Sequence, residues 1–180
     1  MPTGYQINNQ VGTYFLTFQV VAWVDMFTRR RYKNILVDSF NYCIHQKGLQ
    51  VHAWCIMSNH VHCILSAKDE NLSDIIRDFK THTSKALIKS IEEEPESRKE
   101  WMLYQFKKAA GKHLRNATYQ VWTHENHAVE LTTNEMMETR LNYIHQNAIE
   151  AGYVERAEDY IYSSAIDYSE GKGMVAITVL

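Results

Sequence analysis

The N-terminal part of the chain changes from a β-type residue pattern to a helical one. Residues 13–24 are rich in β-branched and aromatic types, which predicts a central strand. Residues 30–47 carry apolar side chains, from Tyr32 to Ile44, at the spacing of one helix face. Gly48 follows where a helix C-terminal cap is expected. The pattern therefore predicts a strand followed by a helix.

Two more strands are predicted on either side of a short turn. Residues 49–57 alternate so that every second side chain shares one face. Ser58 and Asn59 form a turn pair, and His60 opens a second strand that runs to Leu65. So short a connection makes the two strands antiparallel.

A long helix and a basic insertion come next. Asn71, with Asp74 three residues later, predicts a helix start. Apolar residues then recur at helical spacing up to about Glu94, and Pro95 stops the helix. Residues 95–118 are expected to form a basic, partly helical insertion.

The last predicted helix follows two short β-type segments. Residues 119–123 and 127–131 are expected to be strands. Thr132 and Glu135 have the spacing of a capping box, so they predict the start of a helix that ends at Gly152.

The element order β-α-β-β-α-β-α predicts an α+β fold with a ferredoxin-like split β-α-β antiparallel sheet and helices on one face. We expect one domain over residues 1–180, with a core at about 12–168 and a C-terminal tail at 169–180. The last ten residues are compatible with an edge strand or with packing on a partner.

Composition is that of an ordinary globular protein. Apolar residues make up 45% of the 180 positions and charged residues 22%. The sequence has no apolar run long enough to span a membrane and no signal-peptide layout, which makes a cytoplasmic protein the expectation. Three cysteines without a CxxC pair argue against a disulfide framework.

Basic residues are concentrated in two places although the net charge is −2. Residues 98–115 hold six basic side chains against one acid, and residues 29–33 hold a second group. A basic surface is therefore possible, although solvated helix faces explain either cluster equally well.

Two pairs of side chains are candidates for chemistry. His60 and His62 lie two apart in a strand, so both imidazoles project from one face, as half of a metal site does. Tyr143 and Asn147 are four apart on the last helix and share one face beside its core stripe. Taken separately, each pair also has an ordinary explanation. The first is consistent with two histidines near a strand start, and the second with a half-buried tyrosine beside an asparagine.

The combination of these residues with their flanking motifs resembles a known family. Residues 57–65, Met-Ser-Asn-His-Val-His-Cys-Ile-Leu, resemble the HUH motif of single-tyrosine insertion-sequence transposases. Residues 141–154, from Leu-Asn-Tyr-Ile-His-Gln-Asn to Ala-Gly-Tyr-Val, resemble the tyrosine motif of the REP-associated tyrosine transposase branch. Val121-Trp122, Tyr162-Ser-Ser-Ala165 and Asp167-Tyr168 resemble the flanking motifs of that branch. The resemblance covers about residues 12–168. Ala148 and Ser58 stand where the family often has proline, which bears on loop geometry.

The resemblance implies a metal-dependent single-stranded DNA endonuclease and strand transferase. Tyr143, on the last helix, matches the nucleophile that forms a 5′-phosphotyrosine link. His60, His62 and Asn147 match ligands of a divalent ion, Mg²⁺ or Mn²⁺, which acts as a Lewis acid on the scissile phosphate. The chain has no Walker-type motif, consistent with strand rejoining without ATP.

The resemblance also implies hairpin-containing single-stranded DNA as the partner, at repetitive palindromes or insertion-sequence ends. The expected protein is bacterial, cytoplasmic and nucleoid-associated, and either a monomer or a homodimer. Such DNA is bound through backbone charge and base stacking. The candidate DNA-binding residues are Lys107, Lys108, Lys112, Arg115, Arg30 and Lys85.

Two other functions stay open. A domesticated protein that binds hairpin DNA without cutting would keep the basic insertion and lose a ligand or Tyr143, yet all four site residues are present. An unrelated metallohydrolase would need a third histidine or a carboxylate. His52 is available on the neighbouring strand, but no acid lies near the pair in sequence.

Overall fold

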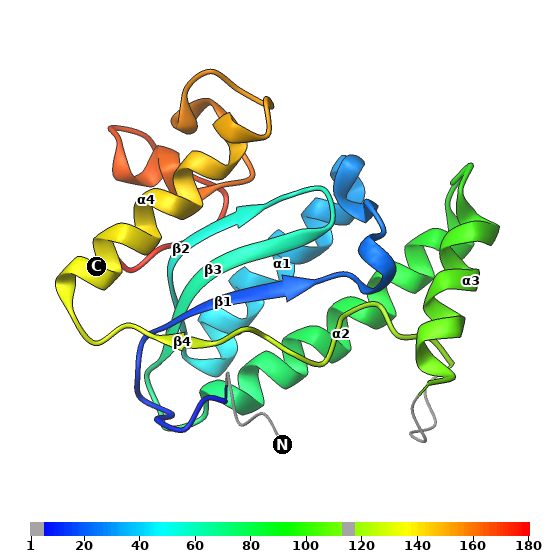
Figure 1. Cartoon of the computed structure of the whole chain (residues 1–180), viewed down its shortest axis with the longest axis horizontal. Helices are drawn as coiled ribbons and strands as arrows, with labels where there is room; N and C mark the ends of the chain where they lie inside the picture. The colour runs from blue at the N-terminus through cyan, green and yellow to red at the C-terminus, as the bar shows by residue number, and fades with distance from the viewer. Residues whose placement is uncertain (1–5, 113–117) are drawn as a thin grey trace.

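The computed structural model describes residues 6–112 and 118–180, which form an α+β fold around one antiparallel sheet (Figure 1). The strands are β1 (Tyr14–Gln19), β2 (Leu49–Ile56), β3 (His60–Ala67) and β4 (Val129–Glu130). Their order in the sheet is β2-β3-β1-β4. The predicted split β-α-β topology is therefore confirmed.

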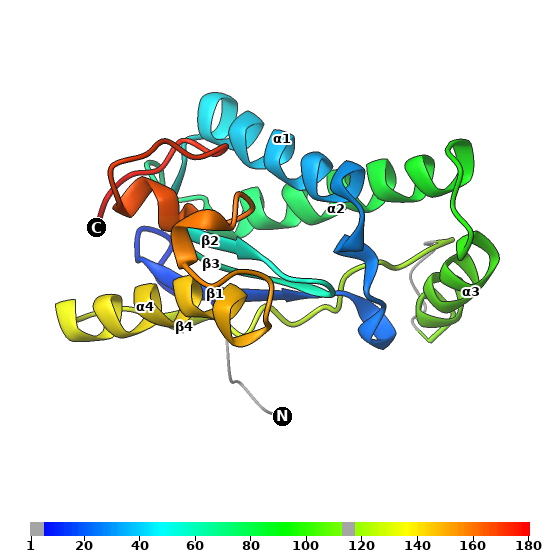
Figure 2. The same cartoon turned by 90° about the horizontal axis from the view of Figure 1, so that it is seen from above.

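The helices cover both faces of this sheet. Helices α1 (Arg30–Lys47) and α2 (Leu72–Glu93) pack together on one face. Helix α4 (Asn134–Glu150) lies across the opposite face, against β2 and β3, as Figure 2 shows. Helix α3 (Lys99–Ala110) stands beyond the end of β1. The expectation that the helices share one face holds for α1 and α2 and is corrected for α4.

Aromatic side chains fill the core between the sheet and the α1–α2 layer. Phe40 of α1 lies 4.6 Å from Phe79 of α2 and 6.4 Å from Trp54 of β2, measured between ring centroids. Phe18 of β1 lies 5.8 Å from Phe79. These rings are almost fully buried, so one face of β1, β2 and β3 is committed to the core.

Three strand predictions extend beyond the observed pairing. The first strand ends at Gln19 rather than Val24, because Ala22 and Trp23 take left-handed backbone conformations with φ of 54° and 55°. Of the segments predicted at 119–123 and 127–131, the first makes only an isolated bridge from Trp122 to Val20, and the second pairs only at β4. His127 has φ of 46°, so the second segment does not begin in extended backbone despite its β-type composition.

The helix ends show which local predictions were right. Gly48 caps α1 with φ of 72°, as predicted. Asn71 occupies the N-cap position of α2, but its side chain makes no capping hydrogen bond. The cap of α4 is Thr133, whose hydroxyl accepts from the Met136 N–H, and not Thr132.

Residues 160–164, which follow α4 and precede the C-terminal tail, fix α4 to the edge of the sheet. Ser164 Oγ accepts the Trp54 backbone N–H of β2 at 3.0 Å and lies 2.9 Å from His145 Nε2 of α4. The Tyr160 hydroxyl donates to the Ile56 carbonyl at 2.7 Å, and the Ile56 N–H donates to the Tyr162 carbonyl. This 160–164 segment therefore joins β2 and α4 through buried polar contacts.

The last residues run along the outer edge of β2. The Thr178 N–H donates to the Val51 carbonyl at 2.8 Å, and the Thr178 carbonyl lies 2.7 Å from His52 Nδ1. Val175 is buried. This segment answers the question that the sequence left open, because it lies along the edge of this chain's own sheet.

The three cysteines, Cys43, Cys55 and Cys63, are buried and form no disulfide. No helix in residues 6–112 and 118–180 combines the length and the apolarity that crossing a membrane requires.

The substitution Ser164→Ala tests the link between the 160–164 segment and α4. It leaves the buried Trp54 N–H without its acceptor and removes the polar contact of His145, so we expect a loss of about 2 kcal/mol in the free energy of unfolding. Urea titration measures this loss. Ser169→Ala is the control, since its exposed hydroxyl bonds only within the local turn. Equal stability of the two variants would contradict the role given to Ser164.

Candidate active site

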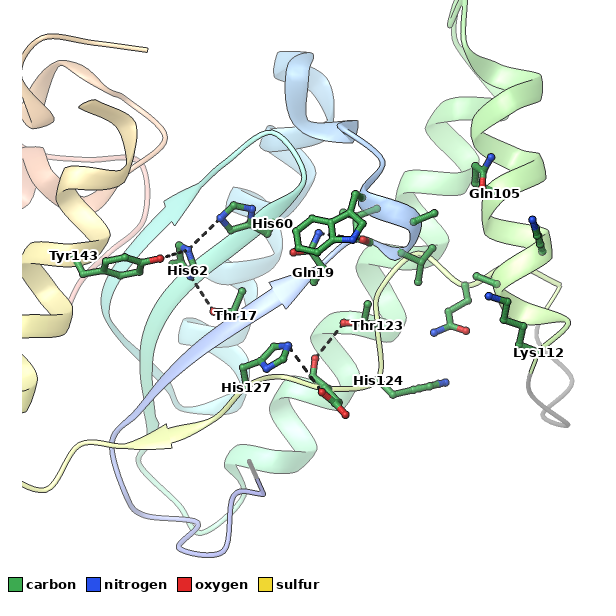
Figure 3. Close-up of a pocket in the computed structure, with 18 residues that line it drawn as sticks. Thr17, Gln19, His60, His62, Gln105, Lys112, Thr123, His124, His127 and Tyr143 are labelled. Atoms are coloured by element: carbon green, nitrogen blue, oxygen red, sulfur yellow. Dashed lines mark hydrogen bonds and ion pairs between the residues drawn. The ribbon is translucent and has the colours of Figure 1, made fainter. Parts of the chain in front are cut away.

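His60 and His62 project from the face of β3 that α4 covers. Their Nε2 atoms are 3.1 Å apart, and Val61 between them is buried on the opposite face, as strand alternation predicted. Figure 3 shows both rings at the open side of the sheet, with the Tyr143 ring beside them. The spacing of two in a strand therefore correctly predicted that both imidazoles project from one face.

The remaining nitrogen of each imidazole is held by a neighbouring polar group. His60 Nδ1 lies 2.6 Å from Asn59 Oδ1, and His62 Nδ1 lies 2.9 Å from the Thr17 hydroxyl. An amide oxygen only accepts, so His60 Nδ1 carries the proton and its Nε2 presents a lone pair. Sequence reasoning missed both partners. Thr17 becomes recognisable only through the register that sets it opposite His62.

Burial keeps both imidazoles neutral. Burial lowers the pKa of His60. Burial, together with electrostatic interactions with His60 and Arg140, lowers the pKa of His62 to about 3. At neutral pH both rings are therefore uncharged, which is the form that binds metal ions.

Tyr143 comes from α4 and reaches the histidine pair within one chain. Its hydroxyl lies 3.4 Å from His62 Nε2, and its side chain is 41% exposed. Edge-on contacts with the His62 ring at 5.2 Å and the Phe15 ring at 5.9 Å hold the phenol ring in place. The arrangement offers a solvent-accessible oxygen nucleophile beside two neutral nitrogen donors.

Asn147 lies one turn after Tyr143, as its spacing indicated, but it does not line the cavity at the histidine pair. Its amide nitrogen donates to the Tyr143 carbonyl at 2.7 Å, which leaves the amide oxygen to accept. A metal-ligand role for Asn147 remains a prediction. Within residues 6–112 and 118–180 no group of three His, Cys, Asp or Glu side chains is placed to share a metal ion.

A cavity of about 850 Å³ extends from this centre to α3. His60, His62 and Tyr143 line one part, and Lys108 of α3 and Lys112, two residues after the helix ends, line another. Figure 3 shows Lys112 across the cavity from Tyr143. The basic insertion therefore faces the same space as the proposed nucleophile.

The other predicted DNA-binding residues are placed differently. Lys107, Arg30 and Lys85 are exposed on α3, α1 and α2, but none lines the cavity. Arg115 lies outside the described residues. Their DNA contacts remain predictions, and the cavity favours Lys108 and Lys112.

Two arginines near Arg30 are already engaged in the fold. Glu96, whose side chain is fully buried, lies 2.8 Å from Arg29 and 3.4 Å from Arg31. The Tyr32 hydroxyl donates to the same carboxylate at 2.9 Å. This cluster ties the start of α1 to the turn between α2 and α3.

Several other polar and aromatic side chains near the site also have defined places in the fold. His52 lies 2.8 Å from Ser66 Oγ and is also bonded to the tail, so it supplies no third ligand to the pair. Half-buried Lys80 donates to the Thr123 carbonyl and to Asn126, and desolvation lowers its pKa to about 8. Phe106 is buried in the core, whereas Trp101 and Tyr104 are exposed on α3 outside the cavity.

Comparison with known protein families gives a match that spans the whole site. The model described as "Transposase IS200 like" matches residues 14–147, a span that runs from β1 through both histidines to Tyr143 and Asn147. This chain belongs to the IS200-like transposase family. A search of curated proteins finds no match.

Two solved structures are similar to this IS200-like transposase. A REP-associated tyrosine transposase bound to a REP hairpin has a TM-score of 0.64 at 16% identity, covering 98% of this chain and 92% of that chain. A protein from Deinococcus radiodurans R1 that is described as a transposase has a TM-score of 0.45 at 17% identity, covering 82% and 97%. The first similarity shows a shared fold over nearly the full length of both proteins.

The depressed pKa of the Glu96 carboxyl makes the free energy of unfolding depend on pH. Burial alone would raise the pKa of this carboxyl, but the Arg98 backbone N–H, the Tyr32 hydroxyl and the Arg29 guanidinium lower it to about 2. Since the folded pKa is depressed, the contribution to stability is complete above the ordinary value of 4.5 and is lost as the pH falls toward 2.

We therefore expect Glu96→Gln to lower the free energy of unfolding by about 2 kcal/mol at pH 7, with the difference from wild type shrinking below pH 4.5. Urea midpoints across this pH range measure it. Glu93→Gln, at an exposed helix position, is the control. A difference that stays constant with pH would contradict the assignment to the ionised carboxylate.

Proposed function

We propose that this transposase is a metal-dependent endonuclease and strand transferase that cuts hairpin-containing single-stranded DNA through a 5′-phosphotyrosine intermediate. The observation that carries the proposal is the 3.4 Å separation of the Tyr143 hydroxyl from His62 Nε2, beside the second imidazole. It supports a nucleophile and a metal-binding pair that act on one phosphate.

The proposed reaction has balanced bond changes. The Tyr143 oxygen forms a bond to phosphorus while the bond from phosphorus to the 3′-oxygen breaks. The phenol loses its proton, and the departing oxygen becomes a 3′-hydroxyl. The phosphotyrosine link keeps the phosphoester, so another 3′-hydroxyl can attack it and rejoin strands without ATP.

The donor atoms fit a divalent ion. Two ligand nitrogens that lie about 2.1 Å from one ion and meet near a right angle are about 3 Å apart, and the two Nε2 atoms are 3.1 Å apart. Asn59 and Thr17 orient the rings through the opposite nitrogens, as outer partners of metal-bound histidines do. We propose His60, His62 and Asn147 as ligands of Mg²⁺ or Mn²⁺. When bound, such an ion supplies Lewis-acid polarisation of the scissile phosphate.

The proposed substrate is DNA with a hairpin next to a single strand. A protein of the same fold, a REP-associated tyrosine transposase, has been solved with a REP hairpin, which supports hairpin DNA as the partner. Lys108 and Lys112 supply cations along the cavity that leads to Tyr143.

Covalent trapping tests the reaction. Wild-type protein mixed with labelled hairpin oligonucleotides and Mn²⁺ or Mg²⁺ is expected to give a protein–DNA adduct on a denaturing gel. Tyr143→Phe removes the attacking oxygen and should abolish the adduct. His60→Ala removes one nitrogen donor and should reduce adduct formation by about 100-fold or more.

Tyr153→Phe is the matched control, because this tyrosine is also about half exposed but packs against Tyr160 beyond the end of α4. It should form the adduct normally. Native-gel retardation without an adduct, for every hairpin and metal tried, would contradict the proposed reaction. It would favour the alternative of a hairpin-binding protein that does not cut.

Metal binding is tested separately, without DNA. Mn²⁺ titration followed by calorimetry should show one site, lost in His60→Ala. Asn147→Ala should weaken it by about tenfold if the amide oxygen is a ligand. Gln146→Ala, one position earlier and exposed, is the control and should bind Mn²⁺ as wild type does. Unchanged affinity in Asn147→Ala would remove Asn147 from the ligand set.

A further inference from the structure

Trp23 is the most exposed large aromatic side chain in the described chain, with 72% of its surface accessible. It lines the cavity that also contains His60, His62 and Tyr143. The sequence pattern placed it inside a strand, where its large apolar surface would have been buried. The backbone conformation at this point therefore turns the ring out into solvent.

That backbone is held in an unfavourable conformation. Ala22 and Trp23 have φ of 54° and 55°, and two consecutive left-handed residues without glycine are costly. Val21 and Val24 on either side are buried. The Val21 N–H donates to the Val121 carbonyl at 2.8 Å, which anchors the turn to the following segment.

The surroundings of Trp23 determine what can bind there. The turn that carries it follows β1 and packs against α3, between the sheet and that helix in Figure 1. Lys108 of α3 and Lys112, just after the helix, line the same cavity, together with Glu125, which lies 4.0 Å from His127. Neither lysine has an ion-pair partner within the described part of the chain.

An exposed aromatic ring beside unpaired lysines is the combination that binds single-stranded nucleic acid. The ring stacks on a base, while the cations follow the backbone phosphates. We propose that Trp23 is a stacking platform for an unpaired base of the single strand that leads from α3 to Tyr143. This inference rests on the proposed function for its choice of single-stranded DNA as the ligand.

The test compares two probes of equal charge, a thymidine oligonucleotide and an abasic strand, each of about 15 nucleotides. Binding is measured by fluorescence anisotropy with EDTA present and on a Tyr143→Phe background, so that no cutting occurs. Trp23→Ala should weaken binding of the thymidine strand by about tenfold and leave the abasic strand unchanged. Trp23→Phe should restore most of the lost affinity.

Trp101→Ala is the matched control, because Trp101 is exposed on α3 outside the cavity. It should change neither probe. Lys108→Ala should weaken both probes equally and reduce the salt dependence of binding. Equal losses on both probes in Trp23→Ala, or no loss on either, would overturn the platform.

A stability measurement separates binding from a structural role. Trp23→Gly relieves the left-handed strain, so its urea midpoint should rise while base-dependent binding falls. A lower midpoint would make Trp23 a structural residue and overturn the inference. If the wild-type protein forms no covalent adduct but Trp23 contributes base-dependent binding, only the proposed function is contradicted. If the wild-type protein forms the adduct but Trp23 contributes no base-dependent binding, only the stacking role is contradicted.

Discussion

The site depends on one constraint, the docking of α4 across the face of the sheet that carries the two histidines. An amphipathic helix with only Ile144 and Ala148 fully buried has little apolar area with which to hold this position. Polar contacts to the 160–164 segment add what packing lacks, above all the hydroxyl of Ser164 between the Trp54 N–H and His145. This segment therefore supports the candidate active site although it contributes no reacting atom.

The orientation of the two histidines follows from the sheet and from two polar neighbours. Strand alternation directs both imidazoles to one side, and the antiparallel register brings Thr17 opposite His62. Asn59 and Thr17 hold the inner nitrogens, so the outer nitrogens converge. Two neutral donors and a phenol oxygen then meet beside a cavity that runs to Lys108 and Lys112. The proposed chemistry and the proposed substrate path therefore share one concave surface.

The sequence predicted the parts of this arrangement that follow from short periods. The period of two in a strand placed the histidine pair, and the spacing of four in a helix placed Tyr143 and Asn147 together. Tertiary relations were out of reach, because the register that selects Thr17 is set by pairing across the sheet. The left-handed turn at Trp23 was missed because its residues favour a strand when considered alone.

The central claim is that one chain supplies the histidine pair and the tyrosine. Mixing Tyr143→Phe with His60→Ala tests it directly, because each variant lacks a different half of the site. The account predicts that the mixture, like each variant alone, forms no more than residual covalent adduct with hairpin DNA. Recovery of adduct on the His60→Ala chain, which retains Tyr143, would show that the site is completed by a second copy and would contradict the account.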